Sequence, residues 1–425
     1  MKQKITGQII MRKLGMHIAM LCGATAAGLL LLLAVYMLPV KPMEEHIRQS
    51  LPMIEREFEE GYLLEDYPGS FMGGFTDCLM LEHAVYQSDG HSMLEQVLCM
   101  YRGESSEAGW APGYSLIDYL GGKAQPREES YARYWHGYLV LLKPFLLLTS
   151  YTTIRMIAAV LQLILTGMVL MAFLKRGEEF LGTAFLVSLP FFYYFSLFTS
   201  LSLSICFYLL AAVILAELKW DGKLRAARRY GEFFFAAGML TSYFDFLTYP
   251  IVILGFPLCI YLYWNRESWK DELLHIIGYS AEWGAGYLGL WAMKWIVTDL
   301  FTGNGTIADA VSTLSRRTEK VGDTSGAAGL LEVLKVNVDV YANWAFGLLL
   351  LGTVIWLAAY LYKKRRAVCG ESLQHAALLL FVALYPFIWF CCTQNHSWEH
   401  WMFTYKILSV TVFAGICAVG RMCRE

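Results

Sequence analysis

The stretch LGMHIAMLCGATAAGLLLLLAVYMLPV, residues 14–40, decides the fold of this chain. A helix needs about 20 apolar residues to cross the roughly 30 Å hydrocarbon core of a bilayer, and this run exceeds that length. Basic residues precede the run, as they do in a signal peptide, at Lys2, Lys4, Arg12 and Lys13. The run is longer than the roughly 7–15 residues of a signal peptide, and no small-residue cleavage site follows. We therefore expect an uncleaved first membrane span whose N-terminus is cytoplasmic.

The composition extends this interpretation to the whole chain of 425 residues. Hydrophobic residues make up 57% and charged residues 16%, against about 45–50% and about 25% in soluble domains. These values exclude an ordinary soluble enzyme, a disordered protein and a nucleic-acid-binding protein. The sequence predicts an all-α, polytopic bundle of about ten transmembrane helices. The further apolar runs are 153–174, 179–196, 200–218, 231–247, 249–264, 273–297, 342–362, 375–392 and 402–420.

The distribution of basic residues predicts the orientation of this bundle. Cytoplasmic loops carry an excess of Lys and Arg. With ten spans, the segments on one side are the N-terminus, 175–178, 219–230, 265–272, 363–374 and 421–425, and each contains at least two bases. The short segments on the other side, 196–200, 247–249 and 393–401, contain no Lys or Arg. We therefore expect a multi-pass cell-membrane protein with both termini in the cytoplasm.

Two long segments are expected outside the cell, 41–152 and 298–341. The first is acidic overall but rich in apolar residues, which indicates folded structure. Residues 43–60 have the spacing of an amphipathic helix on the membrane surface. Residues 138–149 are apolar but short and contain Pro144, which suggests an interfacial or re-entrant helix. The predicted organisation is therefore 1–40, 41–152, 153–297, 298–341 and 342–425, and the fourth part, which contains Arg316 and Arg317, is a candidate mobile lid.

The first candidate site is Asp77 in GSFMGGFTDCLML. An acid flanked by apolar residues is expected to be partly buried, and burial either raises its pKa or requires a partner. The functional interpretation is a general base that deprotonates a sugar hydroxyl. The structural alternative is an Asp that caps the helix that follows.

The second candidate site is the run RYWHGY, which begins at Arg133. Tyr134 and Trp135 are suited to stack on a sugar, and His136 to bind a hydroxyl or a phosphate. Beyond them, Lys143 and Arg155 are candidates for binding a donor phosphate. The alternative is an interfacial aromatic belt with bases whose charged ends reach towards water.

Two further candidates lie in predicted spans. Asp245 sits among aromatic residues in YFDFLTYP, and an acid at a membrane boundary is costly unless it is paired or functional. Glu282 and Lys294 are twelve residues apart, roughly 18 Å along a helix, so they cannot pair directly. Lys294 lies near the outer end and is a candidate for binding an anionic headgroup. A salt bridge with a neighbouring span is the alternative for each of these charges.

The last candidate site is NHSWEHWMFTYK, residues 395–406. His396, Glu399 and His400 are candidates for contacting a sugar or phosphate, and Lys406 for the donor phosphate. Two His four residues apart on a helix also suit a divalent metal, but no third ligand is evident, and we expect neither a metal nor another cofactor.

Ten cysteines are present, and only Cys78 and Cys99 share the long outer segment. The sequence leaves two alternatives open, namely a disulfide between them and two free thiols in apolar surroundings.

The order of these features resembles the GT-C membrane glycosyltransferases, in which a first span is followed by a long outer segment that carries an acid, and then by a many-span bundle. The segments FTDCLML, YWHGYLVLLKP, YFDFLTYP, GYLGLWAMKW and NHSWEHWMFTYK also resemble those of a group of multi-span membrane proteins of Gram-positive bacteria. The GT-C resemblance implies a polyprenyl-phosphate-linked sugar as donor, a glycan or lipid acceptor of the cell envelope, and a catalytic acid in the first outer loop. It covers the architecture of the whole chain.

One departure from the GT-C pattern leaves the base open. The GT-C acid usually follows the first span within a few residues, where this chain has Glu44 and Glu45, whereas Asp77 lies much farther on. Its apolar setting favours Asp77. The alternatives to a glycosyltransferase are a transporter or flippase and a polymerase of lipid-linked glycans. The absence of an internal repeat and the gathering of polar residues on one side disfavour a transporter.

Overall fold

The computed structural model of the chain describes residues 2–65, 67–109, 111–265, 267–321, 326–365 and 368–424. Apart from loops, turns and one small antiparallel sheet, the described residues are helical. In that sheet β1 (Tyr101–Gly103) pairs with β2 (Glu128–Ser130). The predicted all-α class is therefore confirmed.

Each predicted span falls on a helical segment. Among the described residues, six segments are long and apolar enough to cross a membrane: Met11–Tyr36 of α1 (Lys2–Tyr36), α8 (Tyr151–Lys175), α10 (Leu201–Ala227), α16 (Trp344–Lys364), Gly370–Cys392 and Trp401–Met422. The fifth joins α17 (Gly370–Val382) and α18 (Tyr385–Cys392), and the sixth contains α20 (Trp401–Thr404) and α21 (Ser409–Met422). The remaining predicted spans correspond to α9 (Glu179–Ser188) with η2 (Leu189–Phe192), α11 (Tyr230–Phe244), α12 (Val252–Trp264) and α13 (Trp269–Thr302). Six apolar helices are compatible with a membrane protein, and the count of ten stays a prediction.

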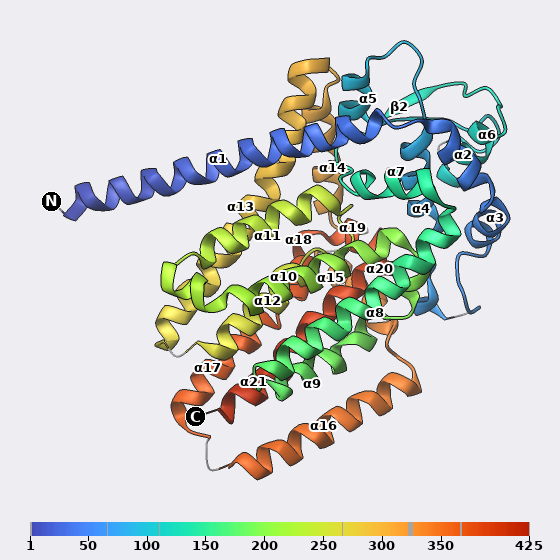
Figure 1. Cartoon of the computed structure of the whole chain (residues 1–425). Coiled ribbons are helices and arrows are strands. Elements are labelled where there is room, and N and C mark those ends of the chain that lie inside the picture. Colours follow the sequence, from blue (N-terminus) through green and yellow to red (C-terminus); the bar gives the residue numbers. More distant parts are fainter. Residues whose placement is uncertain are drawn as a thin grey trace.

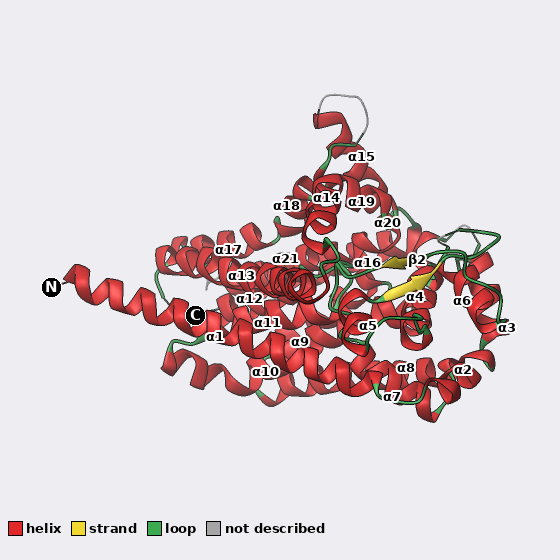
Figure 2. Cartoon of the chain, turned by 90° about the horizontal axis from the view of Figure 1, so that it is seen from above, coloured by secondary structure: helices red, strands yellow, loops and turns green. Residues whose placement is uncertain are grey.

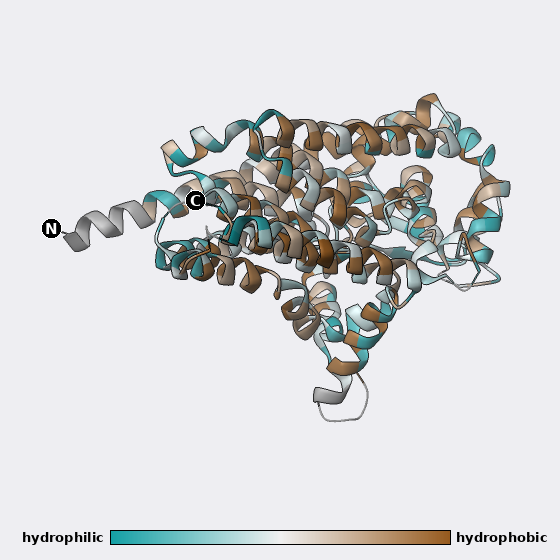
Figure 3. Cartoon of the chain, turned by 90° about the horizontal axis from the view of Figure 1, so that it is seen from below, coloured by the Kyte–Doolittle hydropathy of each residue, from teal (hydrophilic) through white to brown (hydrophobic). Residues whose placement is uncertain are grey.

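The bundle helices lie side by side, and both chain ends lie on the side away from α2–α6 (Figure 1). Helix α16 lies at the edge of the bundle, and of its residues only Phe346 is buried. Hydrophobic residues follow the bundle helices along their length, while hydrophilic residues are more frequent towards the two ends (Figure 3). This distribution is expected where the middle of the bundle faces lipid.

Two glycines allow the closest packing in the bundle, between α11 and α13. A Cβ at Gly238 would lie 2.1 Å from the carbonyl oxygen of Trp283, and one at Gly286 would lie 2.1 Å from that of Phe235. Small residues bring membrane helices into direct backbone contact in this way. The close approach fixes the position of the α13 side chains described below.

The first long segment forms a layer of short helices at one end of the bundle. These are α2 (Val40–Arg48), α3 (Leu51–Glu60), η1 (Pro68–Ser70), α4 (Gly74–Val85), α5 (Met93–Cys99), α6 (Pro112–Leu120) and α7 (Leu139–Leu148). The amphipathic helix predicted over 43–60 is thus two helices, because Pro52 has no N–H with which to continue the hydrogen bonding of α2, and it suits the first turn of a new helix. The apolar helix predicted near 138–149 is present as α7.

The second long segment begins later than predicted, because α13 continues to Thr302. It contains α14 (Thr306–Thr318) and α15 (Gly326–Asp339), which protrude from the bundle in Figure 2. Helix α14 packs against α13 and against α19 (Gln394–Glu399). The predicted lid segment therefore lies beside the predicted polar turn at 393–401.

Candidate functional site

Asp77 lies in the first turn of α4, but its carboxylate holds the start of a different helix. One oxygen accepts hydrogen bonds from the Ser202 N–H (2.9 Å) and the Ser200 hydroxyl (3.0 Å). The other accepts from the Leu201 N–H (2.8 Å) and the Tyr151 hydroxyl (2.5 Å). A carboxylate has about four lone-pair sites, so all are occupied. Buried at the N-terminus of α10, Asp77 acts as a capping group, which is an arrangement that neither sequence interpretation contained.

Three of the lysines predicted to bind phosphate are buried and cap the C-terminal ends of helical segments. Lys143 donates to the carbonyl oxygen of Ala84 in α4 (2.5 Å), and Lys294 to that of Leu98 in α5 (2.7 Å). Lys406 donates to the carbonyl oxygen of Phe192 at the end of η2 (2.7 Å). The last carbonyls of a helix lack partners within the helix, and a cation satisfies them well. These lysines therefore stabilise the joints between helices.

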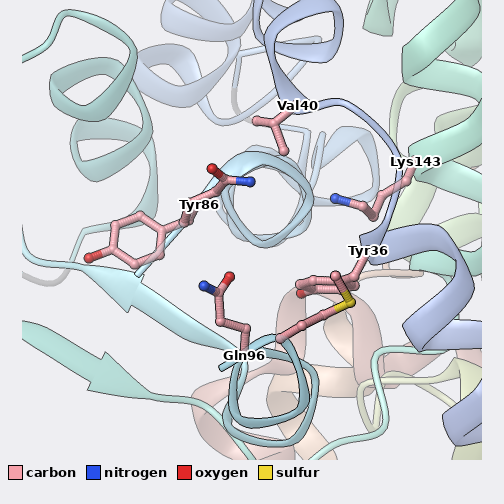
Figure 4. Close-up of a pocket in the computed structure, with 7 residues that line it drawn as sticks. Tyr36, Val40, Tyr86, Gln96 and Lys143 are labelled. Atoms are coloured by element: carbon pink, nitrogen blue, oxygen red, sulfur yellow. The ribbon is translucent and has the colours of Figure 1, made fainter. Parts of the chain in front are cut away.

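The fourth predicted phosphate ligand, Arg155, forms an ion pair with Glu57 at 2.5 Å. Lys143 lines a pocket of about 120 Å³ between α1, α4, α5 and α7. Its ammonium group and the ring of Tyr36 face this pocket (Figure 4) and lie 4.6 Å apart. Burial lowers the pKa of Lys143 to about 8. The predicted phosphate ligands are thus distributed over separate joints and do not meet in one site.

A different cavity collects several of the predicted substrate-binding residues or their neighbours. We call it the α13–α14 cleft. It has a volume of about 280 Å³ and lies between α13, α14, α18 and the loop that precedes α7. No Asp or Glu is among the lining residues that the structure describes. Aromatic and aliphatic side chains form most of its wall, and Leu288 and Leu314 at its edge are exposed. The cleft is therefore a largely apolar space that reaches the surface beside Leu288 and Leu314.

One wall of this cleft is a ladder of aromatic rings on α13. Trp283, Tyr287, Trp291 and Trp295 are four residues apart, so they share one face of the helix. Their consecutive ring centroids are 5.0, 4.8 and 6.2 Å apart. Within the described part of the chain, the indole N–H groups of Trp283 and Trp291 and the Tyr287 hydroxyl are buried without a hydrogen-bond partner. Buried polar groups are normally satisfied, so these three indicate donors available to a ligand or to water.

Arg317 on α14 brings a positive charge to the cleft. Its guanidinium carbon lies 5.6 Å from the centroid of the Tyr134 ring. Within the described ranges, no ion pair joins Arg317 to a carboxylate, whereas Arg133 at the same cleft is paired with Asp309 at 2.8 Å. An Arg in a largely apolar cleft without an acid is an exception to the usual pairing of buried charge. It is the strongest sign of an anion site near the cleft.

The three residues of the RYWHGY run that were expected to bind substrate have different surroundings. Tyr134 lines the cleft, 5.7 Å from Trp291 between ring centroids. Trp135 is fully buried and donates its indole N–H to the Leu290 carbonyl (2.8 Å), so it anchors the loop to α13. His136 is buried with a φ of 55°, between the Tyr138 hydroxyl (3.0 Å) and the Tyr131 carbonyl (2.9 Å). Burial lowers the pKa of His136 to about 3. Only Tyr134 reaches the cleft.

Asp245 and His396 both contact the turn that contains Leu247, and Leu247 lines the cleft. Asp245 accepts hydrogen bonds from the Thr248 N–H (3.0 Å) and hydroxyl (2.5 Å) and so closes a tight turn. His396 is 2.9 Å from the Leu247 carbonyl through Nε2, and its Nδ1 has no partner in the described structure. Burial, followed by the proximity of His400 and Arg317, holds the pKa of His396 well below its usual value. Both residues shape the turn behind the cleft.

His400 is only partly buried, and its ring lies 4.7 Å from that of His396. Burial and then the nearby Arg317 lower the pKa of His400 to about 4, so the imidazole is neutral near pH 7. Glu399 is exposed and accepts a hydrogen bond from Asn395 (3.1 Å). Among the described residues, no group of three or more His, Cys, Asp or Glu side chains is placed to hold a metal ion.

The remaining alternatives of the first outer segment lie away from the cleft. Glu44 is half-buried and Glu45 exposed on α2, whose buried side consists of Met43 and Ile47. Cys78 and Cys99 are both buried free thiols in this structure. Neither glutamate is among the lining residues of the cleft.

Sequence reasoning missed the two features that define the cleft. The four-residue spacing of the aromatic ladder was visible in the sequence, but a run of aromatic residues in a span equally suits a lipid-facing surface. Arg317 was noticed only as part of a lid, because no sequence signal shows which of two adjacent arginines has a carboxylate partner. The comparisons add no constraint, since no family model, no curated protein and no solved structure matches this chain.

Proposed function

We propose that this protein is an integral membrane glycosyltransferase that takes a sugar from a polyprenyl-phosphate donor at the outer leaflet. The acceptor would be a glycan or lipid of the cell envelope. The observation that carries the proposal is the meeting of an apolar aromatic cleft with Arg317, which has no carboxylate partner in the described ranges. An isoprenoid chain linked to a phosphate has the same combination of apolar body and anionic group.

The aromatic ladder supports binding of the lipid part of the donor. The rings of Trp283, Tyr287, Trp291 and Trp295 offer a continuous apolar face along α13. Leu288 and Leu314 are exposed at the edge of the cleft, so a chain could enter sideways from the bilayer without crossing water. Burial of apolar surface then supplies binding free energy at about 25 cal/mol per Å².

Arg317 is the proposed ligand of the donor phosphate. A guanidinium group forms paired hydrogen bonds to phosphate oxygens, and such bonds are about twice as strong as neutral ones. The charge is already held near the cleft by its contact with Tyr134. Tyr134 is suited to contact the first sugar, because it lies between this charge and the α13 ladder.

In the proposed transfer, an acceptor hydroxyl oxygen attacks the anomeric carbon of the donor sugar. A new C–O bond forms, and the bond between the anomeric carbon and the phosphate oxygen breaks. The polyprenyl phosphate leaves with that electron pair, and the hydroxyl proton passes to a base. Asp77 has no free lone pair, so we propose His400, a neutral imidazole at the C-terminal end of α19, the helix that packs against α14 and its Arg317. A phosphate bound beside it would raise its pKa and improve it as a base.

The first test measures binding of farnesyl phosphate, a short soluble analogue of the donor lipid, through tryptophan fluorescence of the purified protein in detergent. Arg317→Gln should weaken binding about 10- to 100-fold, since a charge-assisted hydrogen bond contributes roughly 1.5–3 kcal/mol. Arg316→Gln is the matched control, because it removes the same charge from an exposed neighbour on the same helix. Equal binding by both variants and the parent would exclude Arg317 as the phosphate ligand.

The second test separates catalysis from binding. The protein is reconstituted with polyprenyl-phosphate-linked hexoses and a cell-envelope extract, and release of free polyprenyl phosphate is measured. His400→Gln should abolish release while leaving farnesyl phosphate binding within about threefold, because a neutral base contributes mainly to the proton transfer. Full activity of this variant would exclude the proposed base.

One observation favours a second candidate, a flippase for lipid-linked glycans. The cleft has no Asp or Glu among its described lining residues, and the predicted acid, Asp77, is occupied as a cap. A flippase needs to bind the lipid phosphate but needs no base. In liposomes, movement of the labelled polyprenyl-phosphate sugar between leaflets without release of polyprenyl phosphate would replace the enzyme by this alternative.

A further inference from the structure

A second, larger cavity lies at the opposite, predicted cytoplasmic end of the bundle. We call it the basal pocket. Its volume is about 850 Å³, and it lies where α1 passes the turn between α10 and α11 and the start of α13. Figure 1 shows α1 passing α13 and projecting beyond the bundle at its N-terminal end. Among the described residues, five basic ones line the basal pocket, namely Arg12, Lys13, Arg225, Arg228 and Arg229.

The acids at the basal pocket are mostly neutralised by partners within the protein. Glu282 forms an ion pair with Lys13 and lies 3.2 Å from His17. Glu267 lies 3.0 Å from His275 and accepts a hydrogen bond from Asn265. These contacts leave Glu232 as the lining acid with no ion pair among the described residues.

The bases fall into two groups. Arg225 is held in place by Asp221 (2.7 Å), the Asn265 side chain (3.0 Å) and the Tyr261 carbonyl (3.1 Å). Arg12, Arg228 and Arg229 form no ion pair with any acid in the part of the chain that the structure describes. The basal pocket therefore has an excess of positive charge that the protein itself does not neutralise.

The backbone adds donors to this positive region. Arg228 ends α10 with a φ of 54°, and this left-handed residue makes the turn to α11 only two residues long. The turn places both guanidinium groups at the basal pocket, together with the N-terminus of α11, which has no side-chain cap. The free N–H groups at a helix N-terminus and its positive dipole end both favour an anion.

The floor of the basal pocket is aromatic. The rings of Tyr279 and His275 stack at 5.2 Å, and Tyr230 and Tyr261 lie 4.6 Å apart beside them. Tyr230 and Tyr261 are almost completely buried. The rings beneath the cationic rim carry hydroxyl and imidazole groups, so the basal pocket offers polar contacts to a charged headgroup. Basic pockets between membrane helices on the cytoplasmic side bind lipid headgroups.

We propose that the basal pocket is a binding site for the phosphate of an anionic phospholipid, with Arg228 and Arg229 as its principal ligands. This site is separate from the α13–α14 cleft, and it does not depend on the glycosyltransferase proposal. The lipid would hold α1 against the α10–α11 turn and α13, because all of these elements contribute to the basal pocket.

The test uses the full-length protein in a nonionic detergent and three probes. These are dioctanoyl phosphatidylglycerol, dioctanoyl phosphatidylcholine with the same chains but no net charge, and inorganic phosphate. The unfolding temperature is followed by tryptophan fluorescence, and retained lipid is counted by native mass spectrometry. A ligand that binds only the folded state raises the unfolding temperature in proportion to the logarithm of its concentration over Kd. Phosphatidylglycerol should raise it at concentrations at which phosphatidylcholine does not.

The double variant Arg228→Gln with Arg229→Gln should weaken phosphatidylglycerol binding about 30-fold, at about fivefold for each cation removed. The matched control is Lys363→Gln with Lys364→Gln, which removes the same charge from exposed residues at the same predicted side but outside the basal pocket. It should bind as the parent does.

Equal loss of binding in both double variants, or equal stabilisation by the two lipids, would overturn the proposal, because either result indicates non-specific attraction or insertion. Inorganic phosphate that protects the parent at the same concentration as phosphatidylglycerol would assign a free phosphate as the ligand of the same residues and exclude the lipid. The unfolding temperature of each variant without any probe verifies that it is folded.

Discussion

The helix joints of the first outer segment and the α13–α14 cleft both contain charged side chains, but these charges have different surroundings. At the joints, Asp77 and Lys294 are buried and every hydrogen-bonding site of the Asp77 carboxylate is used. In the cleft, Arg317 has no carboxylate partner within the described ranges, and the neighbouring indole N–H groups of Trp283 and Trp291 are unpaired. A buried charge whose partners belong to the protein stabilises the fold, whereas one without them indicates a ligand. The predictions below test this distinction.

The largest effect is expected at Asp77. Asp77→Ala removes the acceptor of four hydrogen bonds and exposes the N-terminal N–H groups of α10 to an apolar interior. Because each buried unsatisfied group costs roughly 1–3 kcal/mol, we expect the free energy of unfolding to fall by about 4 kcal/mol. The measurement is reversible unfolding in mixed detergent micelles.

The control for Asp77 is Glu107→Ala, which breaks an exposed ion pair with Lys123. Such pairs contribute about 0–1 kcal/mol, so this variant should resemble the parent. A decrease in the free energy of unfolding that is no larger for Asp77→Ala than for Glu107→Ala would contradict the capping role of Asp77. The folded fraction of Asp77→Asn should still bind farnesyl phosphate, since Asp77 does not line the cleft.

A smaller effect is expected at Lys294. Lys294→Met keeps the chain volume but removes the ammonium donor from the carbonyl groups of Val97 and Leu98, and Leu98 keeps only a long hydrogen bond from the Thr298 hydroxyl (3.4 Å). The variant no longer has to bury an ammonium group, and this gain offsets part of the stability lost with the hydrogen bonds. We expect the free energy of unfolding to fall by about 2 kcal/mol. Lys335→Met, at an exposed position of α15, should stay within about 0.5 kcal/mol of the parent. A stabilised Lys294→Met protein would show that this lysine is kept for a purpose other than the joint.

The buried His136 predicts a pH dependence of stability. Its pKa in the folded protein is about 3, whereas an unfolded His titrates near about 6.5. Between these values the unfolded state binds more protons, so the free energy of unfolding falls as the pH falls, by up to about 1.4 kcal/mol per pH unit for one His. The ring of His83 is 4.6 Å from that of His136, and burial also lowers the pKa of His83. His83 therefore contributes to the pH dependence of the free energy of unfolding in the same direction.

The His136→Gln protein should therefore lose the His136 share of this slope, up to about 1.4 kcal/mol per pH unit, as read from denaturation midpoints below pH 6.5. The shares of His83, His396 and His400 should remain, because burial lowers their pKa values too. Identical slopes for the variant and the parent would show that His136 takes up a proton without unfolding, and that its surroundings are more polar than the packing indicates.

The smallest effect on stability is expected when two tryptophans are compared, one whose indole N–H is hydrogen-bonded within the protein and one whose indole N–H has no partner in the described structure. Trp135→Phe loses a hydrogen bond to the Leu290 carbonyl, while Trp291→Phe loses none that the described structure contains. Both lose a similar area, so Trp135→Phe should be less stable by about 1 kcal/mol. Trp291→Phe should instead weaken farnesyl phosphate binding. The opposite order in both measurements would move the ligand site from the cleft to the loop before α7.

The sequence predicted the helical architecture well because the signals for it are local. The run 14–40 is apolar over enough consecutive residues to identify α1 without any knowledge of its neighbours. The break between α2 and α3 at Pro52 was missed, although it too is a local effect. Local signals therefore determine where helices begin and end, and they leave the roles of individual charges open.

The roles of the charged residues were decided by contacts between distant parts of the chain. Asp77 accepts hydrogen bonds from residues 200–202, which lie more than 120 positions later in the chain. Lys294 donates a hydrogen bond to Leu98, which lies nearly 200 positions earlier. The α13–α14 cleft is formed by helices that are separate in sequence, with Tyr134 contributed by a still earlier loop. By itself the sequence determined a bundle of apolar helices, since hydrophobic length and spacing are properties of one segment. Only the tertiary structure decided which charges are satisfied, because burial and hydrogen bonding depend on both partners.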